Sequence, residues 1–153
     1  MRERFKIPSA VIILLERNNE GTREILLQKR QNTGYKDDWW DCAASGHVEK
    51  GESMTTAAAR EAKEEIGIDV KQEDLKFSLL SHVCLDVTYS YTYFFVKNFN
   101  GEPQIKEPEK CSDLCWFPIN KLPEKLIPDR KQSIIDYLDG KNYNEIGWKK
   151  IKK

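Results

Sequence analysis

The sequence predicts an α+β fold in which a mixed β-sheet is flanked by helices. Strand-like apolar segments stand on both sides of a helical segment, and a second helical segment comes near the end of the chain. The length of 153 residues is usual for one compact domain. Because no repeat, linker or low-complexity segment divides the chain, we expect a single domain over residues 1–153.

The first half of the chain is expected to begin with a β-hairpin. Residues 10–15 (AVIILL) and 24–30 (EILLQKR) are aliphatic runs separated by the polar stretch ERNNEG, which favours a hairpin with a slightly long loop. After a loop, residues 39–49 (WWDCAASGHVE) have the pattern of a strand that ends in a glycine turn. A helical pattern then begins near Ser53 and stops at Gly67, a glycine suited to the position just past a helix.

The second half is expected to continue the sheet and end with a helix. Residues 75–87 and 89–99 are strand-like and predict an antiparallel pair, because aromatic, Thr and Val residues suit a pleated surface. Residues 100–113 form a turn-rich loop, and residues 114–119 (LCWFPI) predict one more short strand. The last helix is expected within residues 123–140, with Pro128 in its first turn and Gly140 at its end.

The composition argues against several classes of function. Lys plus Arg and Asp plus Glu number 25 each, so no net charge attracts the chain to nucleic acid or to an anionic membrane. The apolar run near the N-terminus is too short to span a bilayer. The four cysteines form no CxxC pair, which disfavours zinc and fits the reduced thiols of a cytoplasmic protein. Any polyanionic ligand must therefore be bound locally, by a metal ion or a few placed cations.

The first predicted helix has two different faces. At about 100° per residue, Glu61, Glu64 and Glu65 fall on one arc. Small and apolar residues share a separate arc, namely Thr55, Ala58, Ala59, Ala62 and Ile66. The acidic arc could belong to an ordinary surface helix, but like charges three and four residues apart repel, and Arg60 cannot neutralise three carboxylates. Hard divalent cations such as Mg²⁺ prefer oxygen ligands, so the arc suits a metal ion.

Residues 46–68 resemble the Nudix box, which is glycine, five residues, glutamate, seven residues, then Arg-Glu-aliphatic-any-Glu-Glu-any-Gly-aliphatic. The matching positions are Gly46, Glu52, Arg60, Glu61, Ala62, Glu64, Glu65, Gly67 and Ile68. The order of the flanking strands is also similar to that of Nudix proteins. The resemblance therefore implies a Nudix-type αβα sandwich.

Nudix proteins are typically Mg²⁺-dependent pyrophosphohydrolases that cut a nucleoside diphosphate linked to another group. The resemblance implies a metal site formed by the peptide carbonyl of Ser45 and the carboxylates of Glu52, Glu61, Glu64 and Glu65. Glu61 would also position or deprotonate the attacking water, and Arg60 would orient the glutamates. Glu52 is alternatively a salt-bridge partner of Arg60. Metal ions suit this reaction because they neutralise the diphosphate and activate water.

Outside the box, the stretch GEPQIKE resembles a loop of MutT-like nucleoside triphosphatases in which a late glutamate joins the metal site or acts as the base. Glu107 is the matching residue, with Glu109 as a weaker match. A solvated proline turn explains the same residues equally well.

Four further residues are candidates for binding the substrate. Asp129 and Arg130, in the stretch LIPDR, lie where MutT-like relatives present base-reading residues, although an ordinary helix start also explains them. Arg30 could hold a phosphate, and Trp40 could stack on a base if it faces the cleft. Tyr89, Tyr91 and Tyr93 are expected on the same face of one strand, where they either line a pocket or pack against the sheet.

The favoured function is Mg²⁺-dependent hydrolysis of the diphosphate linkage in a nucleoside tri- or diphosphate derivative, with Mn²⁺ as an alternative ion. The chain has CAAS before the box glycine, where many Nudix triphosphatases have Leu-Pro-Gly, so the substrate class stays open.

An isopentenyl-diphosphate isomerase and a non-catalytic nucleotide-binding module are the alternative functions. The expected partner is a nucleotide or nucleoside-diphosphate-linked small molecule, without membrane or nucleic acid, and dimers are common in the family, which favours a homodimer.

Overall fold

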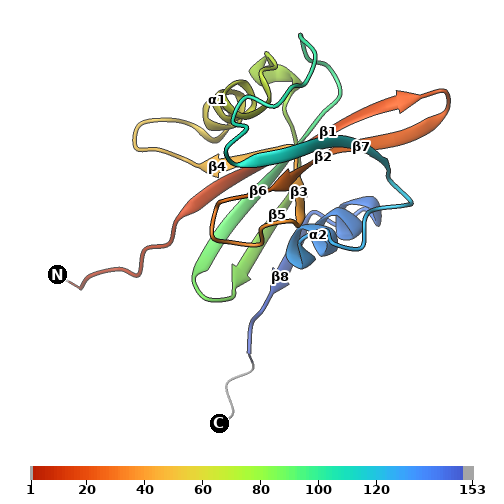
Figure 1. Ribbon diagram of the computed structural model, residues 1–153. Helices are drawn as coiled ribbons and strands as arrows, with labels where there is room; N and C mark the ends of the chain where they lie inside the picture. The colour runs from red at the N-terminus through yellow and green to blue at the C-terminus, as the bar shows by residue number, and fades with distance from the viewer. Residues whose placement is uncertain (1, 150–153) are drawn as a thin grey trace.

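A mixed β-sheet lies between two helices in the computed structural model, which describes residues 2–149 (Figure 1). The elements follow one another as β1 (Ser9–Asn19), β2 (Thr22–Arg30), β3 (Trp40–Cys42), β4 (Ala44–His47), α1 (Met54–Ile66), the 3-10 turn η1 (Gln72–Asp74), β5 (Lys76–Cys84), β6 (Thr88–Val96), β7 (Cys111–Pro118), α2 (Pro128–Leu138) and β8 (Tyr143–Ile146). This architecture confirms the predicted αβα sandwich.

Strand β1 is the centre of the sheet. The strand order is β3-β2-β1-β6-β5-β8, and β4 and β7 pair with β1 and β2, respectively. The pairs β1–β6 and β5–β8 are parallel, whereas the other pairs are antiparallel, so the sheet is mixed as predicted. The expected antiparallel pair of the second half is formed by β5 and β6.

Successive residues of β1 face opposite sides of the sheet, which creates two separate cores. Val11, Ile13 and Leu15 pack in one cluster with the small residues of α1. Ile12 and Leu14 pack in the other cluster, which includes Ile134 of α2 and the sheet residues Leu79 and Tyr93. Because β1 is buried on both faces, its sequence is a continuous aliphatic run rather than an alternating one.

Helix α1 has the predicted bounds because both of its ends are capped. The Ser53 side chain accepts a hydrogen bond from the Thr56 N–H, and Gly67 adopts a left-handed φ of 71° while its N–H donates to the Lys63 carbonyl. The helix buries Ala57 in addition to the predicted Ala58 and Ala62, whereas Ala59 is only partly buried. The buried alanines allow α1 to lie close to the sheet.

Several local predictions differ from the structure. Residues 39–49, expected to form one strand, form two, because β3 pairs with β2 and β4 pairs with β1. Strand β7 begins at Cys111, within the expected loop, because its pairing with β2 reaches Arg30.

The loop of the first hairpin consists of only Glu20 and Gly21, both at positive φ, and is shorter than expected. The reason is that β1 and β2 continue into the polar stretch that was expected to be loop. Strand β8 was not predicted, since YNEI is short and polar; it pairs with β5, and Asn144 bonds to α2. None of the helices formed by residues 2–149 is long and apolar enough to cross a membrane.

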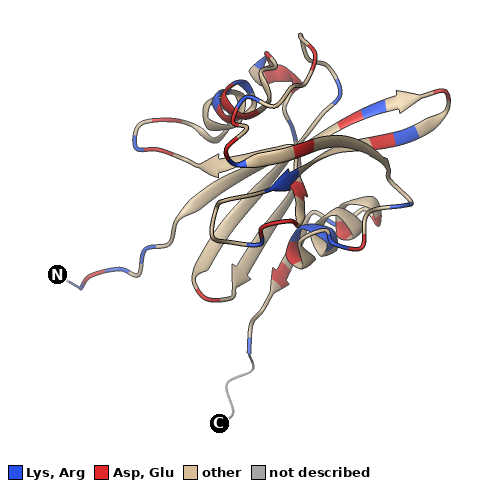
Figure 2. Ribbon diagram, viewed as in Figure 1, with Lys and Arg blue, Asp and Glu red and all other residues tan. Residues whose placement is uncertain are grey.

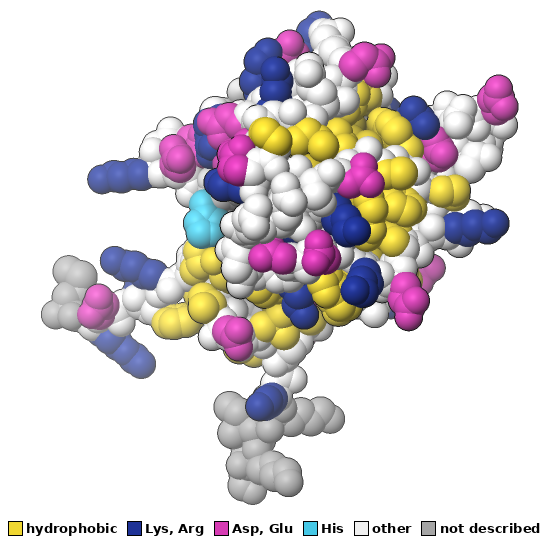
Figure 3. Space-filling view, viewed as in Figure 1, with side chains coloured by type: hydrophobic (Ala, Val, Ile, Leu, Met, Phe, Trp, Pro, Cys, Tyr) yellow, Lys and Arg dark blue, Asp and Glu magenta, His cyan; other side chains and the backbone are white. Residues whose placement is uncertain are grey.

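Charged residues of both signs are spread over the elements, including α1 and the hairpin of β1 and β2 (Figure 2). The face of the molecule in Figure 3 likewise mixes acidic and basic side chains with apolar ones, without one large area of a single sign. This distribution agrees with the equal numbers of acidic and basic residues.

Candidate functional site

Glu61, Glu64 and Glu65 form the acidic edge of α1, and Arg60 binds the first two of these carboxylates. Its guanidinium donates to both oxygens of Glu52, at 2.6 and 3.0 Å, and to Oε1 of Glu61 at 2.7 Å. Further bonds of 3.3 and 3.2 Å reach Glu64 and the His47 carbonyl. Hydrogen bonds with Glu52 raise the pKa of Arg60 and lower the pKa of Glu52. Arg60 therefore ties the loop before α1 to the acidic edge.

Glu65 lies in a different environment, without a cation. Its Oε2 accepts from the Ser45 N–H at 2.9 Å, and its Oε1 accepts from the Gln28 amide at 3.2 Å. Burial raises the pKa of Glu65 well above its ordinary value against the effect of these two bonds, and the nearby Glu61 carboxylate raises it further. Among residues 2–149, Glu65 forms no ion pair with Lys, Arg or His.

Gly46 allows Glu61 to lie directly against β4. A Cβ at position 46 would be 2.7 Å from Cγ of Glu61 and closer still to its carboxyl carbon. The backbone of Gly46 is held by β-pairing with Val11 of β1. The box glycine therefore leaves the space that the Glu61 carboxyl group occupies.

The donor set of this edge fits a hard divalent cation. Within the described part of the chain, no three His, Cys, Asp or Glu side chains are arranged to surround an ion. Glu52, Glu61 and Glu64 instead contact the guanidinium group of Arg60. Glu65, however, is a partly buried carboxylate with only neutral donors, next to a second carboxylate. A cation would relieve this unfavourable arrangement, and carboxylate oxygens are suitable ligands for Mg²⁺.

The predicted loop glutamate is connected to the end of α1. The backbone N–H groups of Gln104 and Lys106 donate to the carbonyls of Ile66 and Glu65, at 3.0 and 3.3 Å. Glu107 follows directly, half-buried, with its carboxylate 3.9 Å from the Lys110 amine. The loop therefore holds Glu107 beside the helix end that carries Glu65.

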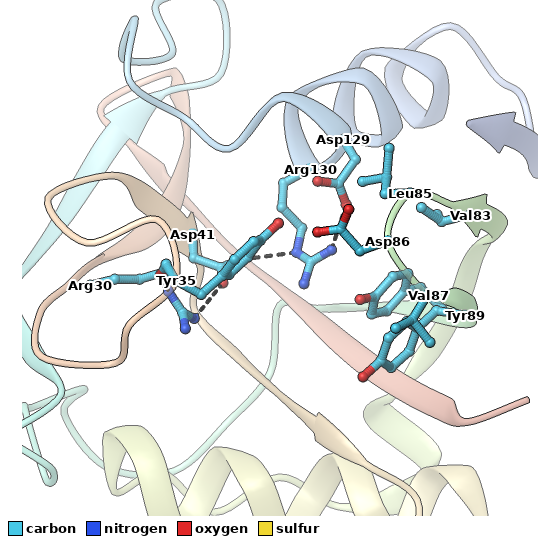
Figure 4. A pocket seen from close by; sticks show the side chains of 11 residues that line it. Arg30, Tyr35, Asp41, Val83, Leu85, Asp86, Val87, Tyr89, Asp129 and Arg130 are labelled. Carbon is cyan, nitrogen blue, oxygen red and sulfur yellow. Dashed lines mark hydrogen bonds and ion pairs between the residues drawn. The ribbon is translucent and has the colours of Figure 1, made fainter. Parts of the chain in front are cut away.

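A pocket of about 290 Å³ opens on the α2 side of β4 (Figure 4). Its lining comes from the end of β2 and the loop after it, from β3, from the β5–β6 hairpin and from the start of α2. The lining residues are Arg30, Tyr35, Asp41, Val83, Leu85, Asp86, Val87, Tyr89, Tyr91, Asp129 and Arg130. Three of the four predicted substrate-binding residues, Arg30, Asp129 and Arg130, thus lie in one cavity. Trp40 is not in this lining; it packs edge-on against Phe117, with ring centroids 4.9 Å apart, beside the second core cluster.

A buried carboxylate holds the two arginines of the pocket. Asp41, 1% exposed, accepts from Arg130 Nε at 3.0 Å and from Arg30 at 3.2 Å. Arg130 also pairs with Asp129 at 2.7 Å, and its guanidinium lies 4.5 Å from the ring centroid of Tyr91. Both guanidinium groups are therefore fixed by the protein itself, as the dashed lines of Figure 4 show.

Aromatic side chains form the walls of the pocket. Tyr35 lies on one side and Tyr89 on the other (Figure 4). Tyr89 and Tyr91 are stacked, with centroids 4.9 Å apart and ring planes 7° apart, while Tyr93 is buried in the core. Tyr89 also makes a 3.3 Å hydrogen bond with Nε2 of His47. This bond connects the pocket to β4, and the His47 carbonyl is bonded to Arg60 on the acidic edge.

Several residues of the site were not predicted from the sequence. Gln28 and Asp41 are paired across β2 and β3 and look like ordinary polar strand positions, while Tyr35 and Asp86 lie in loops. Gln28 alone offered a signal, since it is a polar residue that directly follows the aliphatic residues 25–27 of the strand.

Comparisons with known proteins agree with this architecture. Residues 6–138 match the NUDIX domain family. Over 94 residues the chain is 33% identical to the NAD-capped RNA hydrolase NudC of Stutzerimonas stutzeri, a match that covers 61% of this chain and 32% of NudC. It is 45% identical over 102 residues to an uncharacterized Nudix hydrolase of Listeria innocua, covering 65% of this chain and 58% of that protein. Each match therefore spans less than two thirds of the relative's length.

The fold is also similar to that of solved structures. A MutT NUDIX hydrolase from Burkholderia pseudomallei superposes with a TM-score of 0.75 at 22% sequence identity, over 86% of this chain and 98% of that one. At this identity the similarity concerns the fold.

Proposed function

Because the chain belongs to the Nudix hydrolase family, we propose that it hydrolyses a phosphoric anhydride bond in a nucleoside tri- or diphosphate derivative, with Mg²⁺ or Mn²⁺ as its cofactor. The observation that supports this proposal best is the connection between the acidic edge of α1 and a pocket with aromatic walls, through His47 and Tyr89. From a nucleoside triphosphate, water adds to one phosphorus atom and a bridging P–O bond breaks. Cleavage between the α- and β-phosphates gives nucleoside monophosphate and inorganic pyrophosphate.

The acidic edge supplies the groups for the reaction. Glu52, Glu61, Glu64, Glu65 and the carbonyl of Ser45 would hold the metal ion. When bound, this ion would neutralise the diphosphate and lower the pKa of water. Glu61 positions or deprotonates the attacking water, and Glu107 is the alternative base, because its loop is bonded to the end of α1. Arg60 keeps Glu52, Glu61 and Glu64 together through four hydrogen bonds of its guanidinium group.

The pocket binds the nucleoside end of the substrate. A planar base fits between Tyr35 and the stacked pair of Tyr89 and Tyr91, since aromatic rings favour stacked contacts. Asp129 accepts hydrogen bonds from the base and Arg130 donates them, while the half-exposed Arg30 is available for a phosphate. We assign Trp40 no direct contact with the base, because it packs against Phe117 and does not line the pocket.

A substrate screen tests the proposal. Nucleoside triphosphates, oxidised nucleotides, ADP-ribose, dinucleoside polyphosphates, NADH and an NAD-capped RNA are incubated with Mg²⁺ or Mn²⁺, and the products identify the broken bond. Glu65→Gln is expected to lower turnover by at least about 100-fold, the scale of losing one transition-state contact. Glu20→Gln, in the exposed first hairpin turn, is the matched control and should leave turnover unchanged. Unchanged metal-dependent turnover in Glu65→Gln would refute the metal-binding role.

Two further assays test the alternative functions, an isomerase and a binding module. An isomerase-type metal site built on histidine is not supported, because His47 bonds Tyr89, whereas the ring of His82 lies 4.5 Å from that of Trp148. Conversion of isopentenyl diphosphate into dimethylallyl diphosphate would nevertheless establish that function. Tight nucleotide binding without any product after long incubation would establish a binding module.

We further propose that residues 1–153 act as one domain and that the protein is a homodimer. Light scattering coupled to gel filtration measures the mass in solution, and a mass of one chain, 17.9 kDa, would refute the dimer.

A further inference from the structure

Gln28 is a buried polar residue near the end of β2, directly after the core residues Leu26 and Leu27. It is 9% exposed, while Leu26 and Leu27 are fully buried in the two core clusters. It lies outside the Nudix box, and its partners across the sheet are Asp41 and Leu114. A buried amide is unfavourable unless its hydrogen bonds are satisfied, so its contacts explain why it is tolerated.

The side-chain amide nitrogen of Gln28 meets three acceptors. It lies 3.2 Å from the Cys42 carbonyl, 3.1 Å from the Ala43 carbonyl and 3.2 Å from Oε1 of Glu65. An amide rotated by 180° would place its oxygen against three other oxygens, so the nitrogen must face them. Two N–H groups shared among these acceptors link the turn between β3 and β4 to the carboxylate of Glu65.

The Glu65 carboxylate is consequently held at both oxygens. Gln28 holds Oε1, and the Ser45 N–H holds Oε2 at 2.9 Å. A carboxylate accepts about four hydrogen bonds or metal contacts in total, so each oxygen keeps free lone pairs. Both holding donors are neutral, which leaves the negative charge of Glu65 available to a cation.

We propose that Gln28 is a positioning residue that fixes Glu65 in the orientation needed to bind the divalent cation. This inference rests on the proposed function, in which Glu65 is a metal ligand. Without the amide, the Glu65 carboxyl group can rotate away from the Ser45 N–H, and binding the ion must first restore its orientation. Loss of such a partner of a ligand typically weakens metal binding by about 10–100-fold.

The test measures Mn²⁺ binding to the full chain without nucleotide, from the electron paramagnetic resonance signal of free Mn²⁺. Gln28→Met keeps the size of the side chain but removes the donor, and we expect its dissociation constant for Mn²⁺ to rise by about 10-fold or more. The matched control is Gln132→Met, because Gln132 donates to the carboxylate of Asp136 on α2, away from the acidic edge. The control should bind Mn²⁺ like the wild type.

A double-mutant cycle distinguishes positioning from general damage. If Gln28 acts through Glu65, adding Gln28→Met to Glu65→Gln should weaken Mn²⁺ binding no further. Thermal unfolding checks that each variant is folded; if Gln28→Met is not, Gln28→Asn, with a reach shorter by one methylene, replaces it with the same expectation. Additive losses in the cycle would indicate a structural role and overturn the inference.

The outcomes also separate this inference from the proposed function. Wild-type Mn²⁺ affinity in a folded Gln28→Met protein, together with weak binding by Glu65→Gln, refutes the role of Gln28 alone. Absence of Mn²⁺ binding in the wild type, or unchanged binding in Glu65→Gln, refutes the proposed metal site and the inference with it.

Discussion

Replacing Gly46 with alanine tests whether the position of the Glu61 carboxyl group limits the reaction. Gly46 differs from the other seven glycines of the chain, all of which have positive φ, so alanine at position 46 introduces no backbone strain of that kind. The new Cβ would lie 2.7 Å from Cγ of Glu61, below the 3.0 Å that real Cβ contacts keep, and nearer still to the carboxyl carbon. Because β4 is held by pairing with β1, the side chain of Glu61 must move instead.

The required movement is about 1 Å, and a misplacement of that size in a catalytic group lowers the rate by about 100-fold. This corresponds to about 2.7 kcal/mol in the activation free energy. We expect kcat at saturating Mg²⁺ to fall by this factor, with a much smaller change in the KM for the nucleotide, since the pocket lies on the other side of β4.

Gly51→Ala is the control for this substitution. Position 51 has a φ of 85° and open space around it, so alanine should cost about 1 kcal/mol of stability and leave kcat unchanged. A folded Gly46→Ala protein with wild-type kcat would refute the reasoning, because Glu61 would then have no role that depends on its position.

Two further predictions concern the pocket and the acid stability of the fold. Asp41→Asn removes the buried carboxylate that both pocket arginines share, and should cost about 3 kcal/mol in urea unfolding and raise the KM for the nucleotide; unchanged stability would contradict the ion-pair network. Burial raises the pKa of Asp136, but hydrogen bonds from Asn144 and Gln132 lower it by more, so the pKa is below its ordinary value in the folded state. Its stabilising contribution is therefore complete above the ordinary Asp pKa of about 4 and is lost as the pH falls through the lowered value. The urea midpoint of Asp136→Asn should accordingly fall less steeply with acid than that of the wild type, and parallel pH profiles would refute this.

Local signals in the sequence were sufficient for most of the fold. The aliphatic run of β1 and the caps Ser53 and Gly67 depend on residues near one another in the chain. Helix α1 was predicted with nearly correct bounds, whereas β1 was located correctly but extends to Asn19, beyond the expected end at residue 15. Strand β8 has no such signal, because its short polar sequence becomes a strand only through pairing with β5 and bonds to α2. Its formation depends on contacts that exist only after the rest of the sheet has formed.

The site was predictable where its residues form a fixed pattern along the chain. Spacing alone separates the carboxylates of α1 from its alanines, and the resemblance to the Nudix box assigns them roles. Asp41 and Gln28 had no comparable pattern, since their importance comes from partners on distant segments, Arg130 and Glu65. Trp40 shows that residue type alone can mislead. Its aromatic ring would suit stacking on a base, but its position on the strand packs it against Phe117.

The segment from Asp41 to His47 explains why small residues precede the box glycine. Ala43 and Ala44 are fully buried in the cluster that contains the alanines of α1, so larger side chains there would push the helix away from the sheet. The close approach brings the carboxylate of Glu65 to the Ser45 N–H at 2.9 Å. The same segment ends with His47, whose ring and carbonyl bond to the pocket and to Arg60, respectively. The stretch CAAS is therefore best explained as packing that sets the distance between the acidic edge and the sheet.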